Sequence, residues 1–123
     1  MATLRKETST NYSNQTVLRN ACVVNETLER LSPRWKMQVL FCIHQGQNRF
    51  SLLKDLFPTL ADHVLGLRLR ELELEDLVVK ETDRDAVPPQ VRYFATPKGV
   101  ALLAIMKSLT DWENEFPSSS TAH

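Results

Sequence analysis

Apolar residues recur every three or four positions over most of the chain, the spacing that places side chains on one face of a helix. Between residues 17 and 31 this stripe consists of Val17, Ala21, Val24, Leu28 and Leu31. The dipeptide Ser32-Pro33 predicts the start of a second helix, with the serine as N-cap and the proline at the first helical position. That helix, ending near Gly46, carries the apolar residues Trp35, Val39, Leu40 and Ile43.

Two shorter apolar stripes follow. A third helix is predicted from about Ser51 to Phe57, because Pro58 disfavours its continuation. Its apolar residues are Leu52, Leu53 and Leu56. A fourth helix is predicted from Thr59 or Asp62 to Glu75, with an inner face formed by Leu65, Leu69 and Leu72.

Beyond the fourth helix the apolar period changes to two, which indicates strands. The segments Leu77–Thr82 and Val91–Thr96 predict a hairpin whose loop, residues 83–90, carries two prolines. Thr96-Pro97 predicts the N-cap and first turn of a final helix that extends to about Phe116. Short helices followed directly by a hairpin and another helix indicate a winged helix-turn-helix fold, mainly α with a small β-hairpin.

The length of 123 residues is that of a single domain. Residues 1–16 are polar and predict a flexible N-terminal arm. Pro117 and the polar residues after it predict a flexible tail over residues 117–123. The folded domain is therefore expected over residues 17–116.

Composition weighs against several classes of protein. Lys plus Arg and Asp plus Glu number 15 each, and this neutrality weighs against a nucleic-acid binder without excluding one. There is no signal-peptide core and no apolar run of bilayer length, so we expect a cytoplasmic protein outside the membrane. The two cysteines lack zinc-site spacing, and no nucleophile motif or phosphate loop occurs. We expect no metal, no cofactor and no enzyme activity.

Five features in order along the chain resemble the HxlR-type transcriptional regulators, relatives of the MarR group. They are Cys22, Trp35, the stretches "NRFSLLKDL" and "LGLRLRELE", and the wing "PPQVRYFATPKG" that closes in V-x-Y-x-x-T-P-x-G. The resemblance covers residues 22 to about 113. It implies a DNA-binding homodimer on a palindromic operator, with the fourth helix in the major groove and the wing near the backbone or minor groove.

The chain departs from the family pattern near the parts that would contact DNA. Asp76 replaces a glycine, and Gln90 replaces a basic wing residue. The family's Gly-Gly-Lys before the tryptophan is here Ser32-Pro33-Arg34. Other departures lie in the fourth helix, at Ala61, Asp62, His63, Gly66 and Leu67.

The outward face of the fourth helix holds the candidate base-reading residues. A helix turns about 100° per residue, so inward leucines leave His63, Gly66, Leu67, Arg70 and Leu74 outside. Arg70 is suited to guanine O6 and N7, and the alternative is a solvated arginine paired with Glu71, Glu73 or a neighbour. Leu67 is suited either to a thymine methyl group or to a protein partner. Gly66 either permits close approach to the phosphate backbone or has no function.

Basic and polar residues outside that helix are candidate phosphate contacts, and the alternative for each is a solvated side chain. The candidates are Arg34, Lys36, Arg49, Lys54, Lys80, Arg84, Gln90 and Arg92.

Cys22 occupies the position that senses oxidants or electrophiles in some HxlR-type proteins, and the alternative is a buried inert thiol. Cys42 is expected to be a packing residue. A small-molecule or redox effector is therefore a hypothesis.

The first and last helices carry more apolar surface than one small core needs, which predicts a two-fold dimer. The predicted interface consists of Val17, Leu18, Leu103, Met106, Leu109, Trp112 and Phe116. The alternative function is a winged-helix protein-interaction module with weak or no specific DNA binding.

Overall fold

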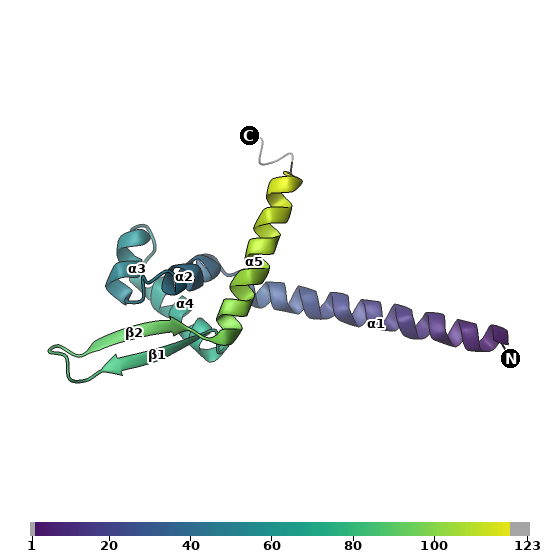
Figure 1. The fold of residues 1–123 in the computed structure, drawn as a ribbon, viewed down its shortest axis with the longest axis horizontal. Coiled ribbons are helices and arrows are strands. Elements are labelled where there is room, and N and C mark those ends of the chain that lie inside the picture. The colour runs from purple at the N-terminus through teal and green to yellow at the C-terminus, as the bar shows by residue number, and fades with distance from the viewer. Residues whose placement is uncertain (1, 119–123) are drawn as a thin grey trace. The chain divides into compact units, whose positions relative to one another are not determined.

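The computed structural model describes residues 2–118, with side chains described from residue 13 onward. The contacts divide the chain into two compact units, one up to Arg34 and one from Trp35 onward. The first unit contains one helix, α1 (Ala2–Leu31). The second unit contains, in order, α2 (Lys36–His44), α3 (Phe50–Leu56), α4 (Asp62–Leu74), β1 (Val78–Asp83), β2 (Gln90–Ala95) and α5 (Pro97–Glu115) (Figure 1).

Helix α1 is longer than the sequence predicted. It begins at Ala2, so the segment 2–16, which was predicted to be a flexible arm outside the first helix, is helical. This segment contains no proline or glycine, the residues that interrupt helices, and its polar side chains do not prevent helix formation. Val17, Val24 and Leu28 of the apolar stripe are all exposed. Residues 119–123 of the predicted tail lie outside the described residues.

The predicted N-cap role of Ser32 is wrong. Its backbone N–H donates to the Leu28 carbonyl at 2.8 Å, and its hydroxyl donates to the Glu29 carbonyl at 3.3 Å. Ser32 therefore ends α1 instead of starting α2. The residue before α2 is Trp35, which has a left-handed φ of 77° and makes no side-chain cap. Its indole packs against Phe57, with the ring centroids 5.4 Å apart.

The core lies among α2, α3, α4 and the start of the hairpin. Val39, Leu40 and Ile43 of α2 and the three predicted inward leucines of α4 are buried, whereas Trp35 before α2 is half-buried. One leucine of α3 is buried, and Leu56 of α3 is exposed. Helices α3 and α4 begin and end within about one residue of the predicted limits. The buried side chains are Val39, Leu40, Ile43, Leu53, Leu65, Leu69 and Leu72, together with Leu60, Leu77 and Val78.

The hairpin forms one antiparallel pair of strands, β1 and β2, with register from Val78↔Ala95 to Asp83↔Gln90. Tyr93 and Ala95 are half-buried, whereas Arg92 and Phe94 are exposed, which confirms the predicted alternation. The Val87–Pro88 peptide bond in the wing loop is cis.

The end of β2 and the start of α5 form one hydrogen-bonded unit. The predicted N-cap is confirmed, because the Thr96 hydroxyl accepts a bond from the Gly99 N–H at 3.0 Å. The same hydroxyl donates to the Asp76 carbonyl at 2.6 Å, and the Thr96 N–H donates to the Leu77 carbonyl at 3.0 Å. A Cβ atom at Gly99 would lie less than 3.0 Å from that Leu77 oxygen. The glycine of the T-P-x-G motif is therefore needed because α5 approaches the chain closely just before β1.

Candidate nucleic-acid interface

The turn between α3 and α4 is held by one lysine. The amino group of Lys54 donates to the Leu60 carbonyl and lies 3.2 Å from the Asp62 carboxylate. Leu60 itself is buried, and its N–H donates to the Phe57 carbonyl at 3.0 Å. Lys54, predicted as a phosphate contact, therefore also has a structural role. Its charge is partly offset by Asp62 at the first turn of α4.

Helix α4 presents the predicted face to the outside. His63, Leu67, Arg70 and Leu74 are exposed, opposite the three buried leucines of the same helix. The side chains of Leu67 and Leu74 are 43% and 72% exposed, which is unusual for leucines on one helix face. Gly66 is half-buried, and a Cβ atom added there would meet no atom within 4 Å. Space inside the protein therefore does not require a glycine at this position.

Lys36 differs most from the sequence expectation. It was a candidate phosphate contact, but it is only 2% exposed and its amino group forms an ion pair with Glu75. Glu71 lies 3.8 Å from the same amino group and also pairs with Arg68. A signal was present in the sequence, because glutamates at positions i and i+4 share one face of a helix. A buried lysine that pairs with two glutamates cannot be found from apolar periodicity alone.

Among the basic residues predicted to contact DNA, four others are exposed and form no ion pair in the described part of the chain. They belong to α4, to the two strands of the hairpin and to the wing loop, and they are Arg70, Lys80, Arg92 and Arg84. Charges that are not neutralised within the protein are the ones available to phosphate. The ion pairs thus separate the basic residues that stabilise the fold from those available for binding.

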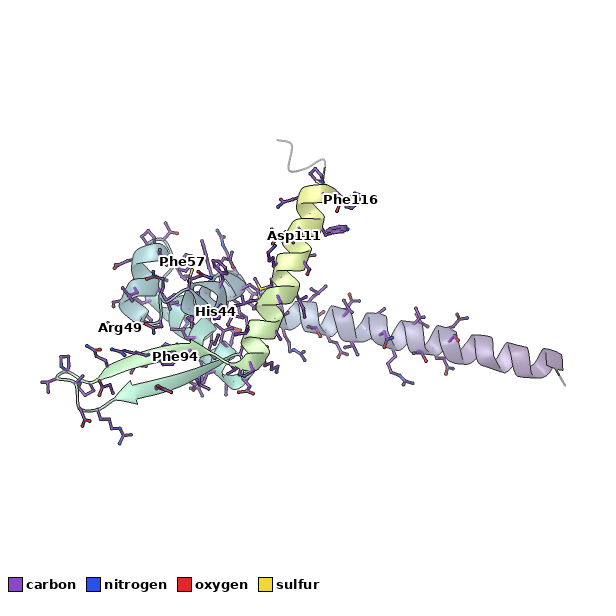
Figure 2. All side chains as sticks on the ribbon, in the orientation of Figure 1. His44, Arg49, Phe57, Phe94, Asp111 and Phe116 are labelled. Carbon is purple, nitrogen blue, oxygen red and sulfur yellow. The ribbon has the colours of Figure 1, made fainter. Side chains whose placement is uncertain are left out.

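Arg49 lies where α3 approaches the hairpin. In Figure 2 it is at the end of α3 nearest β2, next to Asn48, whose carbonyl accepts the Tyr93 N–H at 2.9 Å. Its Nε atom is buried and has no hydrogen-bond partner. Arg34 is exposed just beyond α1.

The wing is not strongly basic. Glu81 lies opposite Arg92 in the register, and Asp83 and Asp85 flank Arg84. Gln90, the replacement for a basic wing residue, is half-buried opposite Asp83. Tyr93 on the inner side of the hairpin has a raised pKa, first because it is partly buried and second because of the charge of Glu73.

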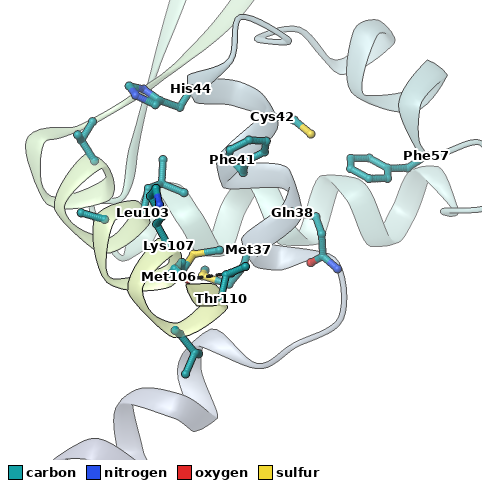
Figure 3. Close-up of a pocket in the computed structure, with 13 residues that line it drawn as sticks. Met37, Gln38, Phe41, Cys42, His44, Phe57, Leu103, Met106, Lys107 and Thr110 are labelled. Carbon is teal, nitrogen blue, oxygen red and sulfur yellow. Dashed lines mark hydrogen bonds between the residues drawn. The ribbon is translucent and has the colours of Figure 1, made fainter. Parts of the chain in front are cut away.

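An apolar cavity of about 1020 Å³ lies between α2 and α5 (Figure 3). Three predicted interface residues line it, of which Leu103 and Met106 are half-buried and Leu109 is exposed. The other predicted interface residues are exposed, namely Val17, Leu18, Trp112 and Phe116.

The two cysteines lie in different environments. Cys22 is exposed on α1. Cys42 lines the α2–α5 cavity and is half-buried, and this burial raises the pKa of its thiol.

The described residues offer neither a metal site nor a membrane span. No group of three or more His, Cys, Asp or Glu side chains is placed to hold a metal ion there. None of the described helices combines the length and apolar character that crossing a membrane requires.

Comparison with known proteins places these features in one family. The family model for HxlR-like helix-turn-helix proteins matches residues 30–121. The helix-turn-helix-type transcriptional regulator YdeP of Bacillus subtilis is 32% identical over 95 residues, which cover 77% of this chain and 73% of that protein. A second relative from the same organism, YvaP, is 34% identical over 91 residues, covering 74% and 83%.

Solved structures agree with this match. A MarR-family transcriptional regulator from Enterococcus faecalis superimposes with a TM-score of 0.73 at 30% identity, covering 84% of this chain and 93% of that one. The redox regulator HypR in its reduced form gives a TM-score of 0.71 at 28% identity, covering 81% and 98%. The winged helix-turn-helix fold predicted from sequence is confirmed.

Proposed function

Because the chain belongs to the HxlR-like helix-turn-helix family of DNA-binding transcription regulators, we propose that it reads a specific DNA sequence as a homodimer. In this proposal α4 enters the major groove, and the wing lies on the backbone or minor groove. The relatives named above come from bacteria. A bacterial regulator acts on DNA in the cytoplasm, so the proposal includes a cytoplasmic location for this protein.

The observation that carries the proposal is the outward face of α4. Arg70 is exposed there and forms no ion pair within the described chain, while the opposite face of the helix is fixed in the core. An arginine on a fixed helix can donate two hydrogen bonds to guanine O6 and N7. His63 is exposed one turn from Leu67, which leaves it free to contact a base or a phosphate. Leu67 is placed to contact a thymine methyl group.

Phosphate contacts are assigned to the exposed basic residues of the hairpin, Lys80, Arg84 and Arg92, with further contacts from Arg34 and Arg49. Gln90, at the loop end of the hairpin, adds a neutral contact. Each phosphate neutralised in this way releases counterions, so the affinity should fall as salt rises. The acidic residues beside Arg84 and Arg92 reduce the local positive charge. We therefore expect moderate affinity and a shallow dependence on salt.

Dimerisation is assigned to the apolar surface of α1 and α5. Trp112 and Phe116 on α5 pack against each other, with centroids 6.5 Å apart, and both remain exposed. Large apolar side chains that are exposed together are typical of a protein interface. A two-fold dimer would place two α4 helices about 34 Å apart, one turn of DNA, which requires a palindromic operator.

A redox effector is a further part of the proposal. Cys22 is exposed, so an oxidant or electrophile has access to its sulfur. Structural neighbours of this chain include proteins described as the redox regulator HypR and diamide-treated YodB. We assign to Cys22 the role of the reactive thiol.

A second candidate function is supported by one specific observation. Leu67 and Leu74 form an exposed apolar pair on the outward face of α4. Such a pair suits a protein partner at least as well as it suits DNA. In that case the fold would serve as an interaction module with weak or no specific DNA binding.

Selection from a random pool of DNA duplexes separates these two functions. The purified protein should enrich one palindromic sequence, and its affinity for that duplex should exceed its affinity for a shuffled duplex of equal composition by 10³-fold or more, on the order seen for specific regulators. Equal affinities for the two duplexes would refute specific reading and favour the interaction module.

A further inference from the structure

A lysine buried beside the recognition helix has a role that the proposed contacts do not explain. Lys36 is the first residue of α2 and is 2% exposed. A buried charge is costly unless it is paired, so its partners must stay in place in the folded protein. One partner, Glu71, belongs to α4, the helix assigned to the major groove, and the other, Glu75, is its C-cap residue.

These glutamates lie on one flank of α4. At about 100° per residue, Arg68, Glu71 and Glu75 share one side of the helix. Viewed along the helix axis, the middle of this side is rotated about 80° to 110° from the buried leucines, and by a similar angle from the outward face with Arg70. Arg68 pairs with Glu71 along this flank. The ionic contacts therefore hold α4 from the side, at right angles to its apolar contacts with the core.

This lateral position matters because the two kinds of contact restrain different motions. Apolar burial is non-directional, so the three leucines resist lifting of α4 from the core more than a small rotation about its axis. Side chains reach about 5–6 Å from the helix axis, so a rotation of about 20° moves groups at the rim by about 2 Å. A displacement of that size separates a hydrogen-bonded ion pair and moves Arg70 off a base edge by a similar amount.

We propose that Lys36 is a positioning residue for DNA reading, which fixes the rotation of α4 through Glu71 and Glu75 without touching DNA. This inference rests on the proposed function of α4.

The contacts around Glu75 extend the restraint to the next helix. The Lys98 amino group donates to the Glu75 carbonyl at 2.8 Å, and the Thr96 hydroxyl donates to the neighbouring Asp76 carbonyl at 2.6 Å. The C-terminal end of α4 is thus attached to α2 by its side chain and to the start of α5 by its backbone. The N-terminal half of α4 has the Lys54–Asp62 pair at its first turn.

The experiment compares Lys36→Met with Glu75→Gln in the full-length protein. Methionine keeps an unbranched side chain in the buried slot, while Glu71 and Glu75, 26% and 24% exposed, can be solvated by water. Lys107→Met is the matched control, because Lys107 also forms a lysine–carboxylate pair, with Asp111 at 3.0 Å, but on exposed α5. The probes are the duplex that the wild-type protein selects and a shuffled duplex, each titrated at several salt concentrations.

We expect the ratio of specific to shuffled affinity to fall about tenfold in Lys36→Met, the size of one mismatched base pair. Glu75→Gln should lower the same ratio, and the double variant should lose less than the two single losses combined, because both act on one contact. The salt slope should stay at the wild-type value, because a buried charge neutralises no phosphate. Lys107→Met should keep the wild-type ratio.

A wild-type ratio in Lys36→Met would overturn the inference. If the salt slope were also reduced by about one, Lys36 would instead contact a phosphate directly. A ratio is independent of the fraction of folded protein, so simple destabilisation does not mimic the expected result. If Lys36→Met does not fold, a wild-type ratio in Glu75→Gln overturns the inference in its place. Failure of the wild-type protein to prefer any duplex would instead refute the proposed function.

Discussion

Replacing Gly99 with alanine should strongly destabilise the protein, whereas the same replacement at Gly66 should stabilise it. Both glycines lie within helices, α5 and α4. At Gly99 the new Cβ would approach the Leu77 carbonyl oxygen to less than 3.0 Å, with the Leu77 carbonyl carbon at 3.2 Å and Leu40 Cδ1 at 3.4 Å. At Gly66 no atom lies within 4 Å of the added Cβ.

The loss of stability in Gly99→Ala can be worked out from the atoms that must move. The Leu77 oxygen is backbone and accepts the Thr96 N–H at 3.0 Å, so it cannot move away without weakening that hydrogen bond. Overpacking of this kind costs about 1–3 kcal/mol, and a weakened backbone hydrogen bond adds about 1 kcal/mol. We therefore expect Gly99→Ala to lose about 2–4 kcal/mol. Gly66→Ala should gain about 1 kcal/mol from helix propensity alone.

Urea unfolding followed by circular dichroism measures both variants against the wild-type protein. The midpoint should fall for Gly99→Ala and rise for Gly66→Ala, at an unchanged slope. Equal midpoints for Gly99→Ala and the wild-type protein would refute the close packing of α5 against the start of β1. A lowered midpoint in Gly66→Ala would show that α4 is not open at that position.

Two further outcomes follow from local conformation and exposure. Asp76 has a left-handed φ of 59°, so Asp76→Gly should stabilise the protein by about 1 kcal/mol, and an unchanged urea midpoint would contradict this. Cys22 is exposed, whereas burial raises the pKa of Cys42, so alkylation at neutral pH should modify Cys22 first, as mass spectrometry of the labelled protein can show. Equal rates for the two thiols would remove the basis for assigning the reactive role to Cys22.

The apolar period was sufficient to predict the elements of the second unit. Leu65, Leu69 and Leu72 specify the inner face of α4, and the structure buries all three. The outward position of Arg70 follows from the same period, so the candidate reading face was predictable. Thr96-Pro97 marked the start of α5 because capping and proline preferences are local properties of the chain.

Some predictions from the sequence differ from the structure, because they depend on contacts that the apolar period does not show. Lys36 was predicted at the surface because it is charged, and its burial depends on glutamates 35 and 39 residues later in the chain. Ser32 carries the N-cap residue type, but its hydroxyl bonds back to α1. The first helix begins at Ala2 and not near Val17, because a helix can extend over a segment that lacks an apolar stripe.

If Arg70 on α4 reads a base, its removal should affect DNA binding differently from the removal of an arginine in the wing. Arg70→Ala and Arg84→Ala both remove an exposed arginine with no ion pair in the described chain. Binding is measured on the wild-type-selected duplex, on the duplexes that change each base pair in turn, and over a range of salt.

We expect Arg70→Ala to lose about 1–3 kcal/mol on the selected duplex and to become indifferent to one base pair in each half-site. Arg84→Ala should weaken binding to all duplexes alike and reduce the salt slope by about one. Wild-type affinity and base preference in Arg70→Ala would show that Arg70 does not read a base. Loss of a protein interaction in Leu67→Ala would then assign the outward face of α4 to a protein partner.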